Sequence, residues 1–278
     1  MSRAIGLLSL LLAALAAAGC MGNDSESAPA ATTPVLQRLH VIFPEGFTRA
    51  EMADRVEAVR TIAIAKRGVI PRLTRTGYLV ASSAARPPAE FRKDLKRRSI
   101  EGFLFPATYE FTKLTSSRAL VRAQLAAFRK QWRKVDLRYA RSKNLTPYDV
   151  LTIASMVEKE TVAPSERRLV AAVVYNRLHD RMPLGIDATI RYGRNVPGTE
   201  PLKESDIRSD DPYNTRNRLG LPPTPIANPG LASMRAAANP ARVDYLYFVR
   251  KPDGVHHFFT ASEPAFCQKS LDYGYGGC

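Results

Sequence analysis

The first half of the chain changes from strand-like to helix-like spacing of its apolar residues. The stretch "LQRLHVIFPEG" predicts a strand that ends in a turn at Pro44 to Gly46. Thr48 and Glu51 then have the spacing of a capping box, which predicts the start of a helix. Apolar residues follow near helical spacing at Met52, Val56, Val59 and Ile62. The pattern predicts a small α+β unit over residues 36–110.

A second amphipathic helix is predicted after residues 101–111, "EGFLFPATYEF", where helical periodicity is absent. Its apolar stripe consists of Val121, Leu125, Phe128, Trp132 and Val135. The basic residues off this stripe are Arg122, Arg129, Lys130, Arg133 and Lys134. We interpret the stripe as core and the basic residues as a solvated face.

Thr146, Pro147 and Asp149 supply a cap, a first-turn proline and a first-turn acid. They predict the start of a helix that runs through "YDVLTIASMVEKE". On a helical wheel its apolar residues cover one broad face, and the polar residues expected on the opposite face are Thr152, Ser155 and Lys159.

Glu158 and Glu160 fall on the two flanks of this apolar face. A glutamate near a helix end is usually a solvated surface residue. A carboxylic acid beside an apolar face can instead be desolvated, which raises its pKa and keeps it protonated until it acts as a general acid. Periodicity does not choose between the two residues.

The rest of the chain predicts one more helix, a long loop and a hairpin. Pro164 and Ser165 start the helix, and residues 195–230 are rich in proline, asparagine and glycine, which is typical of functional loops. Pro252, Asp253 and Gly254 form the turn of a β-hairpin in "DYLYFVRKPDGVHHFF". The predicted fold class is α+β, with a small α+β unit followed by a mainly helical domain over residues 111–278.

Residues 1–20 have the layout of a secretory signal, with one basic residue, a short apolar run and small residues before Cys20. The small residues before Cys20 resemble a lipobox, which predicts lipidation of that cysteine. A cleaved signal and a retained anchor helix are the alternatives, and the apolar run is short for a spanning helix, which needs roughly 20 residues. Residues 21–35 are a predicted flexible tether. Each interpretation predicts export, and the two anchored forms lie at the extracytoplasmic face of the cell membrane.

The chain has 41 basic and 26 acidic residues and a formal net charge of +15. An exported protein meets anionic lipids and cell-wall polymers rather than nucleic acid, so the charge favours an envelope location. Cys267 and Cys278 lie in a glycine-rich tail, and an oxidising compartment predicts a disulfide between them. Two thiols without a CxxC motif argue against a zinc site, and no metal is predicted.

Residues 101–260 contain a series of ordered strings: "EGFLFPATY", "LTIASMVEKET", "SERRLVAAVVYNRL", "MPLGIDATIRYG", "PYNT", "GLPPTPIANPG" and "YLYFV". In their order and spacing these strings resemble the YceG-like family of endolytic murein transglycosylases. The segment "VIFPEGFTRAEMADRV" is similar to part of the LysM-like region of that family. The resemblance implies a truncated LysM-like unit at 36–110 and a lysozyme-like catalytic domain at 111–278.

The resemblance also chooses between the two glutamates. The catalytic glutamate of the family matches Glu160, followed by the hydroxyl residue Thr161, and Glu158 becomes a salt-bridge or orienting residue. The sugar-binding candidates in the matched strings are Asn176, Arg177, Asp187, Thr189, Tyr192, Tyr213, Asn214, Thr215 and His256. Structural alternatives remain for single residues, since Arg177 and Asp187 could form a buried pair and Asn214 could cap a turn. Arg216 stands where the family pattern has tyrosine.

The implied activity is lytic cleavage of the bond between N-acetylmuramic acid and N-acetylglucosamine within peptidoglycan strands, which leaves a 1,6-anhydro end. No cofactor is implied, and the expected partners are glycan strands, the cell membrane and peptidoglycan synthases. Two alternatives remain. One is a non-catalytic peptidoglycan-binding lipoprotein, and the other is a muramidase that uses water and a partner carboxylate such as Asp187.

Overall fold

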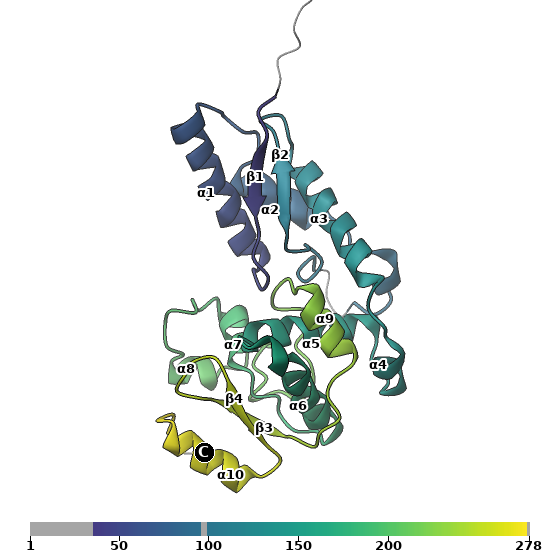
Figure 1. The fold of residues 1–278 in the computed structure, drawn as a ribbon, viewed down its shortest axis with the longest axis vertical. Helices are drawn as coiled ribbons and strands as arrows, with labels where there is room; N and C mark the ends of the chain where they lie inside the picture. Colours follow the sequence, from purple (N-terminus) through teal and green to yellow (C-terminus); the bar gives the residue numbers. More distant parts are fainter. Residues whose placement is uncertain (1–35, 96–98, 277–278) are drawn as a thin grey trace, which may run out of the picture. The chain divides into compact units, whose positions relative to one another are not determined.

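The computed structural model describes residues 36–95 and 99–276 (Figure 1). Strands β1 (Leu39–Ile42) and β2 (Thr108–Phe111) pair antiparallel, with Leu39 opposite Phe111. Helices α1 (Arg49–Arg67) and α2 (Arg75–Ala84) and the 3₁₀ turn η1 (Ala89–Phe91) lie between the strands in the sequence. The pairing of β2 with β1 ties the segment on both sides of residue 110 to the first half of the chain.

Helix α1 begins and ends at the expected signals. Thr48 and Glu51 form the predicted capping box, and Gly68 ends the helix in the left-handed conformation with φ at 60°. The predicted stripe is wrong at its last position, because Ile62 is 58% exposed. At 3.6 residues per turn Ile62 lies about 80° around the helix from Met52. Ala63, eleven residues after Met52, returns to the same face and is buried.

The second half of the described chain is mainly helical and contains a hairpin just before its last helix (Figure 1). Its elements are α3 (Ser117–Trp132), α4 (Arg138–Ser142), α5 (Pro147–Glu160), η2 (Pro164–Glu166), α6 (Arg167–His179), α7 (Asp187–Arg194), α8 (Glu204–Ile207), α9 (Leu231–Ala238), β3 (Tyr247–Arg250), β4 (His257–Thr260) and α10 (Glu263–Asp272). The α+β class is therefore confirmed. The apolar stripe of α3 is buried as predicted, apart from a partly exposed Val135.

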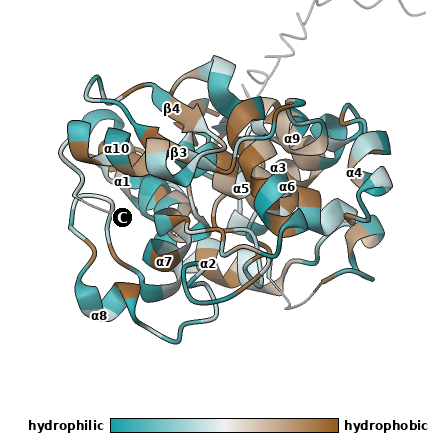
Figure 2. Cartoon of the chain, turned by 90° about the horizontal axis from the view of Figure 1, so that it is seen from below, coloured by the Kyte–Doolittle hydropathy of each residue, from teal (hydrophilic) through white to brown (hydrophobic). Residues whose placement is uncertain are grey.

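Helix α5 lies in the middle of the core, against α6 and α9, and Figure 2 shows strongly hydrophobic segments in this part of the fold. The predicted capping box of Thr146 and Asp149 starts the helix. The prediction of a polar, outward-facing side is wrong for Thr152 and Ser155, which are both buried. Their hydroxyls donate to backbone carbonyls one turn earlier, and Ser155 Oγ also accepts the Ile226 N–H at 3.0 Å. These bonds satisfy the polar groups, so α5 can be enclosed on nearly all sides.

Asn228 joins the β1 turn to the helical half. Its backbone exchanges hydrogen bonds with the turn, from the Gly46 N–H to Asn228 O at 3.0 Å and from the Asn228 N–H to Phe47 O at 2.9 Å. Its side chain accepts the Leu104 N–H and donates to Glu101 Oε1 at 2.7 Å. The buried amide therefore links three segments that are far apart in the sequence.

Gly102 permits this close packing. Its φ is +88°, and a Cβ there would lie 2.7 Å from the ring of Pro225. Both the left-handed backbone and the lack of space require glycine at this position.

The described residues from 36 onward form one compact unit by their backbone contacts. The predicted division at residues 110 and 111 therefore stays a prediction. Within the described residues, none of the helices combines the length and the apolar character needed to cross a membrane.

Candidate functional site

Glu160 is the last residue of α5, and its side chain is partly buried. The helix ends there because Thr161 has an extended backbone conformation. Burial, and then the negative charge of Asp187, raise the pKa of Glu160 to about 7. The positive charge of Arg250 and a hydrogen bond from the Ala188 N–H oppose this shift. An acid with a pKa near neutrality can both give and take a proton at neutral pH.

Thr161 comes directly after Glu160 and caps the end of α5. Its hydroxyl is buried and has no hydrogen-bond partner among the described residues. Buried hydroxyls are normally paired, so Thr161, directly after Glu160, is an exception to that rule.

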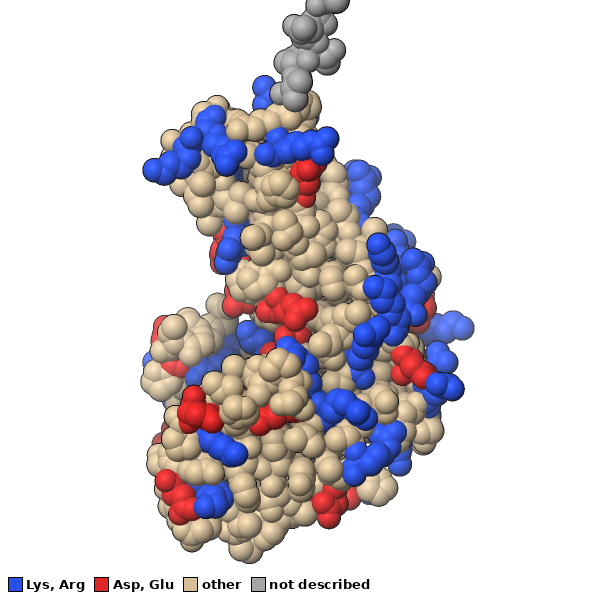
Figure 3. All heavy atoms as spheres, in the orientation of Figure 1, with Lys and Arg blue, Asp and Glu red and all other residues tan. Residues whose placement is uncertain are grey.

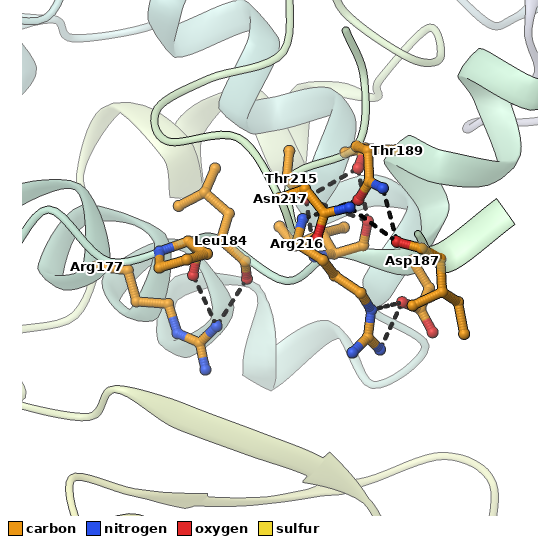
Figure 4. A network of polar contacts seen from close by, with 11 residues as sticks. Arg177, Leu184, Asp187, Thr189, Thr215, Arg216 and Asn217 are labelled. Carbon is orange, nitrogen blue, oxygen red and sulfur yellow. Dashed lines mark hydrogen bonds and ion pairs between the residues drawn. The ribbon is translucent and has the colours of Figure 1, made fainter. Parts of the chain in front are cut away.

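Asp187, the first residue of α7, forms an ion pair with Arg216. The Arg216 Nε and Nη2 atoms lie 2.8 Å and 2.7 Å from Asp187 Oδ1, and Figure 4 shows the guanidinium directed at the carboxylate. The side chains of Arg216 and Asp187 are 43% and 47% exposed. The carboxylate that raises the pKa of Glu160 is thus partly neutralised at the protein surface.

Arg250 approaches Glu160 from the C-terminal hairpin, where its Nη2 donates to the Glu160 carbonyl oxygen at 3.2 Å. Arg250 lies opposite His257 in the β3–β4 register. The buried His257 donates its backbone N–H to Glu166 Oε1 at 3.0 Å, and its ring Nδ1 lies 2.7 Å from Glu166 Oε2. Glu166, at the end of η2, therefore holds strand β4 at His257, the residue that pairs with Arg250 of β3.

Glu158 has a different environment, and its side chain is 6% exposed. It accepts the Gly230 N–H at 2.9 Å, just before α9, and lies 4.0 Å from Arg167. These contacts match the predicted salt-bridge and orienting role. The two glutamates thus face different parts of the protein.

Tyr192 and Tyr213 pack together, with ring centroids 5.1 Å apart. The Tyr213 hydroxyl is 2.8 Å from Thr224 Oγ1, and the Tyr192 hydroxyl donates to the buried Glu101 at 3.2 Å. Burial raises the pKa of Glu101 to about 7, although hydrogen bonds from the Arg49 N–H and Tyr192 oppose the shift. Both rings are partly exposed and remain sugar-binding candidates.

Asn214, Thr215 and Thr189 are buried and hold the loops around α7. Asn214 Nδ2 donates to the carbonyl oxygens of Ile207 and Ser209, each at 2.8 Å, and its Oδ1 accepts the Arg216 N–H. The hydroxyls of Thr215 and Thr189 are 2.9 Å apart, and Figure 4 shows both in this polar network. These contacts correspond to the structural alternative for Asn214, and they use the polar groups that a sugar would need.

Asn176 and His256 do not lie with Glu160, Asp187 and Arg216. Asn176 binds the carbonyl oxygens of residues 243 and 245, and it lines a hollow of about 610 Å³ whose lining contains none of Glu160, Asp187 and Arg216. His256 is exposed in the hairpin turn, with its Nδ1 atom 3.0 Å from Asp253.

The alternative of a buried pair between Arg177 and Asp187 is wrong. Arg177 donates instead to the carbonyl oxygens of Leu246, Pro183 and Leu184, while Asp187 pairs with Arg216. The carbonyls can satisfy the guanidinium without a counter-charge because its donors point in several directions.

A model of the YceG-like family matches residues 23–268. The chain belongs to the YceG-like family. Among curated relatives, it is 34% identical over 230 residues to an endolytic murein transglycosylase of Streptococcus pneumoniae strain R6, covering 78% of this chain and 41% of the relative. It is 37% identical over 165 residues to one of Bacillus subtilis, covering 59% of this chain and 45% of the relative. The chain thus spans less than half the length of these relatives.

The fold of the family is also known from a crystal structure of a YceG-like protein of Listeria monocytogenes. The two structures superpose with a TM-score of 0.68 at 26% identity, covering 84% of this chain and 75% of the other. This similarity supports the mixed helical and small-sheet architecture described above.

Sequence reasoning did not single out four residues of the site, which are Glu101, Glu166, Arg250 and His257. Glu101 opens the family string "EGFLFPATY", and Glu166 lies in "SERRLVAAVVYNRL", so the strings contained two of them. Arg250 and His257 became visible only in the strand register. An alternating hairpin pattern does not reveal which side chain faces a helix end.

The cysteine predictions lie partly or wholly outside the described residues. Cys267 is disulfide-bonded, whereas Cys278 and Cys20 lie outside the described residues. The pairing of Cys267 with Cys278 and the lipidation of Cys20 therefore stay predictions.

Proposed function

We propose that this chain is an endolytic lytic transglycosylase that cleaves peptidoglycan glycan strands, with Glu160 as its catalytic acid. The observation that carries the proposal is one partly buried carboxyl with a pKa raised to about 7, at the exposed end of a buried helix. The printed names of the curated relatives, endolytic murein transglycosylase, agree with this chemistry.

In the proposed reaction, the protonated Glu160 gives its proton to the glycosidic oxygen between N-acetylmuramic acid and N-acetylglucosamine. The resulting carboxylate takes the proton of the C6 hydroxyl of the same muramic acid, and that oxygen attacks the anomeric carbon. The products are a free N-acetylglucosamine end and a 1,6-anhydro end. The nucleophile belongs to the substrate, so one acid is sufficient, unlike the pair of carboxylates used by most glycoside hydrolases.

The neighbouring charges support both halves of this cycle. Asp187 favours the protonated acid before cleavage, and Arg250 favours the carboxylate that forms afterwards. The partly exposed rings of Tyr192 and Tyr213 are the candidates for stacking on a sugar. A hydrolytic muramidase would use Asp187 to activate water. Arg216 already occupies Oδ1 of that carboxylate with both Nε and Nη2, so Asp187 is poorly placed to bind and activate a water, which favours the lytic reaction.

We further propose the family's domain assignment for this chain, with a truncated LysM-like unit at residues 36–110 and a lysozyme-like domain at 111–278. An exported, lipid-anchored location through Cys20 would bring the site to peptidoglycan. The intact mass of membrane-extracted protein should show a diacylglyceryl cysteine at the N-terminus, and retention of Met1 would contradict lipidation.

The decisive experiment compares Glu160→Gln with Glu158→Gln on purified glycan strands. Glutamine preserves the size of the side chain but gives no acidic proton, so Glu160→Gln should lower the rate by about 10²-fold to 10⁴-fold. Mass spectrometry should detect 1,6-anhydro ends with the wild-type chain and almost none with this variant.

Glu158→Gln is the matched control, since it changes the same side chain two residues away. It should keep most of the activity, with lower stability because Glu158 pairs with Arg167 and the Gly230 N–H. Loss of activity only in Glu158→Gln would reverse the assignment. Reducing ends in place of anhydro ends would indicate a muramidase, and binding without cleavage would indicate a wall-binding protein.

A further inference from the structure

The charge of the chain is unevenly distributed along the sequence. Residues 111–148 contain ten basic residues and one acid, Asp136, whereas the whole chain has 41 basic and 26 acidic residues. The basic residues of this segment are Lys113, Arg118, Arg122, Arg129, Lys130, Arg133, Lys134, Arg138, Arg141 and Lys143. The segment forms α3 and α4, and Figure 3 shows Lys and Arg side chains as a band over this part of the surface.

Four of these residues form a straight row on α3. Arg118, Arg122, Arg129 and Arg133 are all exposed, and at 3.6 residues per turn they fall within about 60° of one another. The row spans 15 residues, or about 22 Å. We name these four residues the arginine row.

The arginine row has no internal counter-charges. Within the described residues, none of its four guanidinium groups has an ion pair or a hydrogen bond to an acidic side chain. The single acid of the segment, Asp136, already pairs with Arg138. The positive charges of the row are therefore available to an external anion.

The surroundings of the arginine row favour a charged surface over a specific sugar ligand. The row lies along an exposed flank of α3, and buried Phe128 is about 80° to 140° around the helix from its four members. Its exposed neighbours on the helix include the small residues Ala123 and Ala126. Sugar-binding sites use aromatic rings and fixed amide or carboxylate groups in a concave site, and the arginine row lacks that arrangement.

We propose that the arginine row is a contact surface for anionic phospholipid headgroups, which holds the folded chain against a membrane surface. A planar array of negative charges can meet a straight, exposed row at all four positions at once. Each basic residue near an anionic bilayer strengthens partitioning by about fivefold. This contact is independent of the anchor predicted for residues 1–20 and of the proposed cleavage chemistry.

The test measures partitioning of the full chain to lipid vesicles. Lipid titrations with pure phosphatidylcholine and with a 7:3 mixture of phosphatidylcholine and phosphatidylglycerol give two partition coefficients, and their ratio is the readout. The N-terminal apolar segment contributes to both coefficients, so it largely cancels in the ratio. The wild-type ratio should exceed ten and should fall towards one in about 0.5 M salt, where charges are strongly screened.

The variant replaces all four residues of the row with glutamine, and a control replaces the exposed basic residues Lys66, Arg86, Arg181 and Arg235 with glutamine. The row variant should lose at least tenfold of the ratio. The control loses the same net charge and should change the ratio less than threefold. Thermal melts check that both variants fold.

Three outcomes would overturn the proposal. The first is a wild-type ratio near one, and the second is an equal loss of the ratio in the row variant and the control. The third is a row variant that loses binding to soluble inorganic polyphosphate but keeps the wild-type vesicle ratio. That result would assign the row to an anionic polymer instead of a lipid surface.

Discussion

At the residue scale, the ion pair between Arg216 and Asp187 controls the electrostatic environment of Glu160. Asp187 raises the pKa of Glu160, and Arg216 partly neutralises Asp187. Arg216→Gln should therefore raise the pKa of Glu160 further, by about half a unit for a half-exposed pair. The pH at which cleavage activity falls should move upward by the same amount. A carboxyl-carbon NMR titration of Glu160 provides a second readout that does not depend on activity.

The matched control is Arg218→Gln, which removes a similar surface ion pair with Asp210. It should leave both the pH profile and the Glu160 titration unchanged. A downward shift of the Glu160 pKa in Arg216→Gln would show that Arg216 does not act through Asp187.

At the element scale, the buried pair of Glu166 and His257 attaches the C-terminal hairpin to η2. Glu166→Gln removes the carboxylate that accepts from both the backbone and the ring of His257, so it should destabilise the fold by about 1–3 kcal/mol. Cleavage should also slow, because Arg250 faces His257 and would no longer be held beside Glu160. Denaturant unfolding and product release measure the two effects.

Glu263→Gln, at the exposed start of α10, is the control for this change and should affect neither measurement. If Glu166→Gln retains wild-type stability and rate, the hairpin is fixed by its apolar contacts alone, and the positioning role of Glu166 is wrong.

At the scale of the whole molecule, Glu101 makes the stability depend on pH. It bonds to the Arg49 N–H, Tyr192 and Asn228, and burial raises its pKa to about 7 from 4.5. Between these two values the native state binds more protons than the unfolded state, so stability falls as the pH rises through this window. The contribution of Glu101 is about 3 kcal/mol. The Glu101→Gln variant should not show this loss of stability as the pH rises.

Chemical denaturation of wild type and Glu101→Gln at pH 5 and pH 8 tests this expectation. Glutamine can accept from Arg49 and Asn228 through its oxygen and donate to the Tyr192 hydroxyl, so the variant should fold. The difference between the two proteins isolates Glu101 from the other carboxyls with a raised pKa, which include Glu45 and Glu160. Equal pH dependence in both proteins would show that Glu101 is ionised in the native state at pH 5.

The sequence by itself determined the local structure and the family. Capping boxes at Thr48 and Thr146, the buried stripe of α3 and the Pro252–Gly254 turn all depend on residues within a few positions of one another. Such short-range signals act through hydrogen bonds and periodic burial, which a sequence shows directly. The family strings added the choice of Glu160 as the proposed catalytic acid.

Only the tertiary structure decided which distant groups meet. Four features of the site depend on segments that are separate in the sequence. They are the enclosure of Thr152 and Ser155, the pairing of Asp187 with Arg216, the burial of Glu101 and the position of Arg250 opposite His257. A side chain's partner and pKa depend on the dielectric and the charges around it in three dimensions. Packing creates those surroundings. Burying a polar group costs free energy unless it is hydrogen-bonded, and its partners come from other parts of the chain.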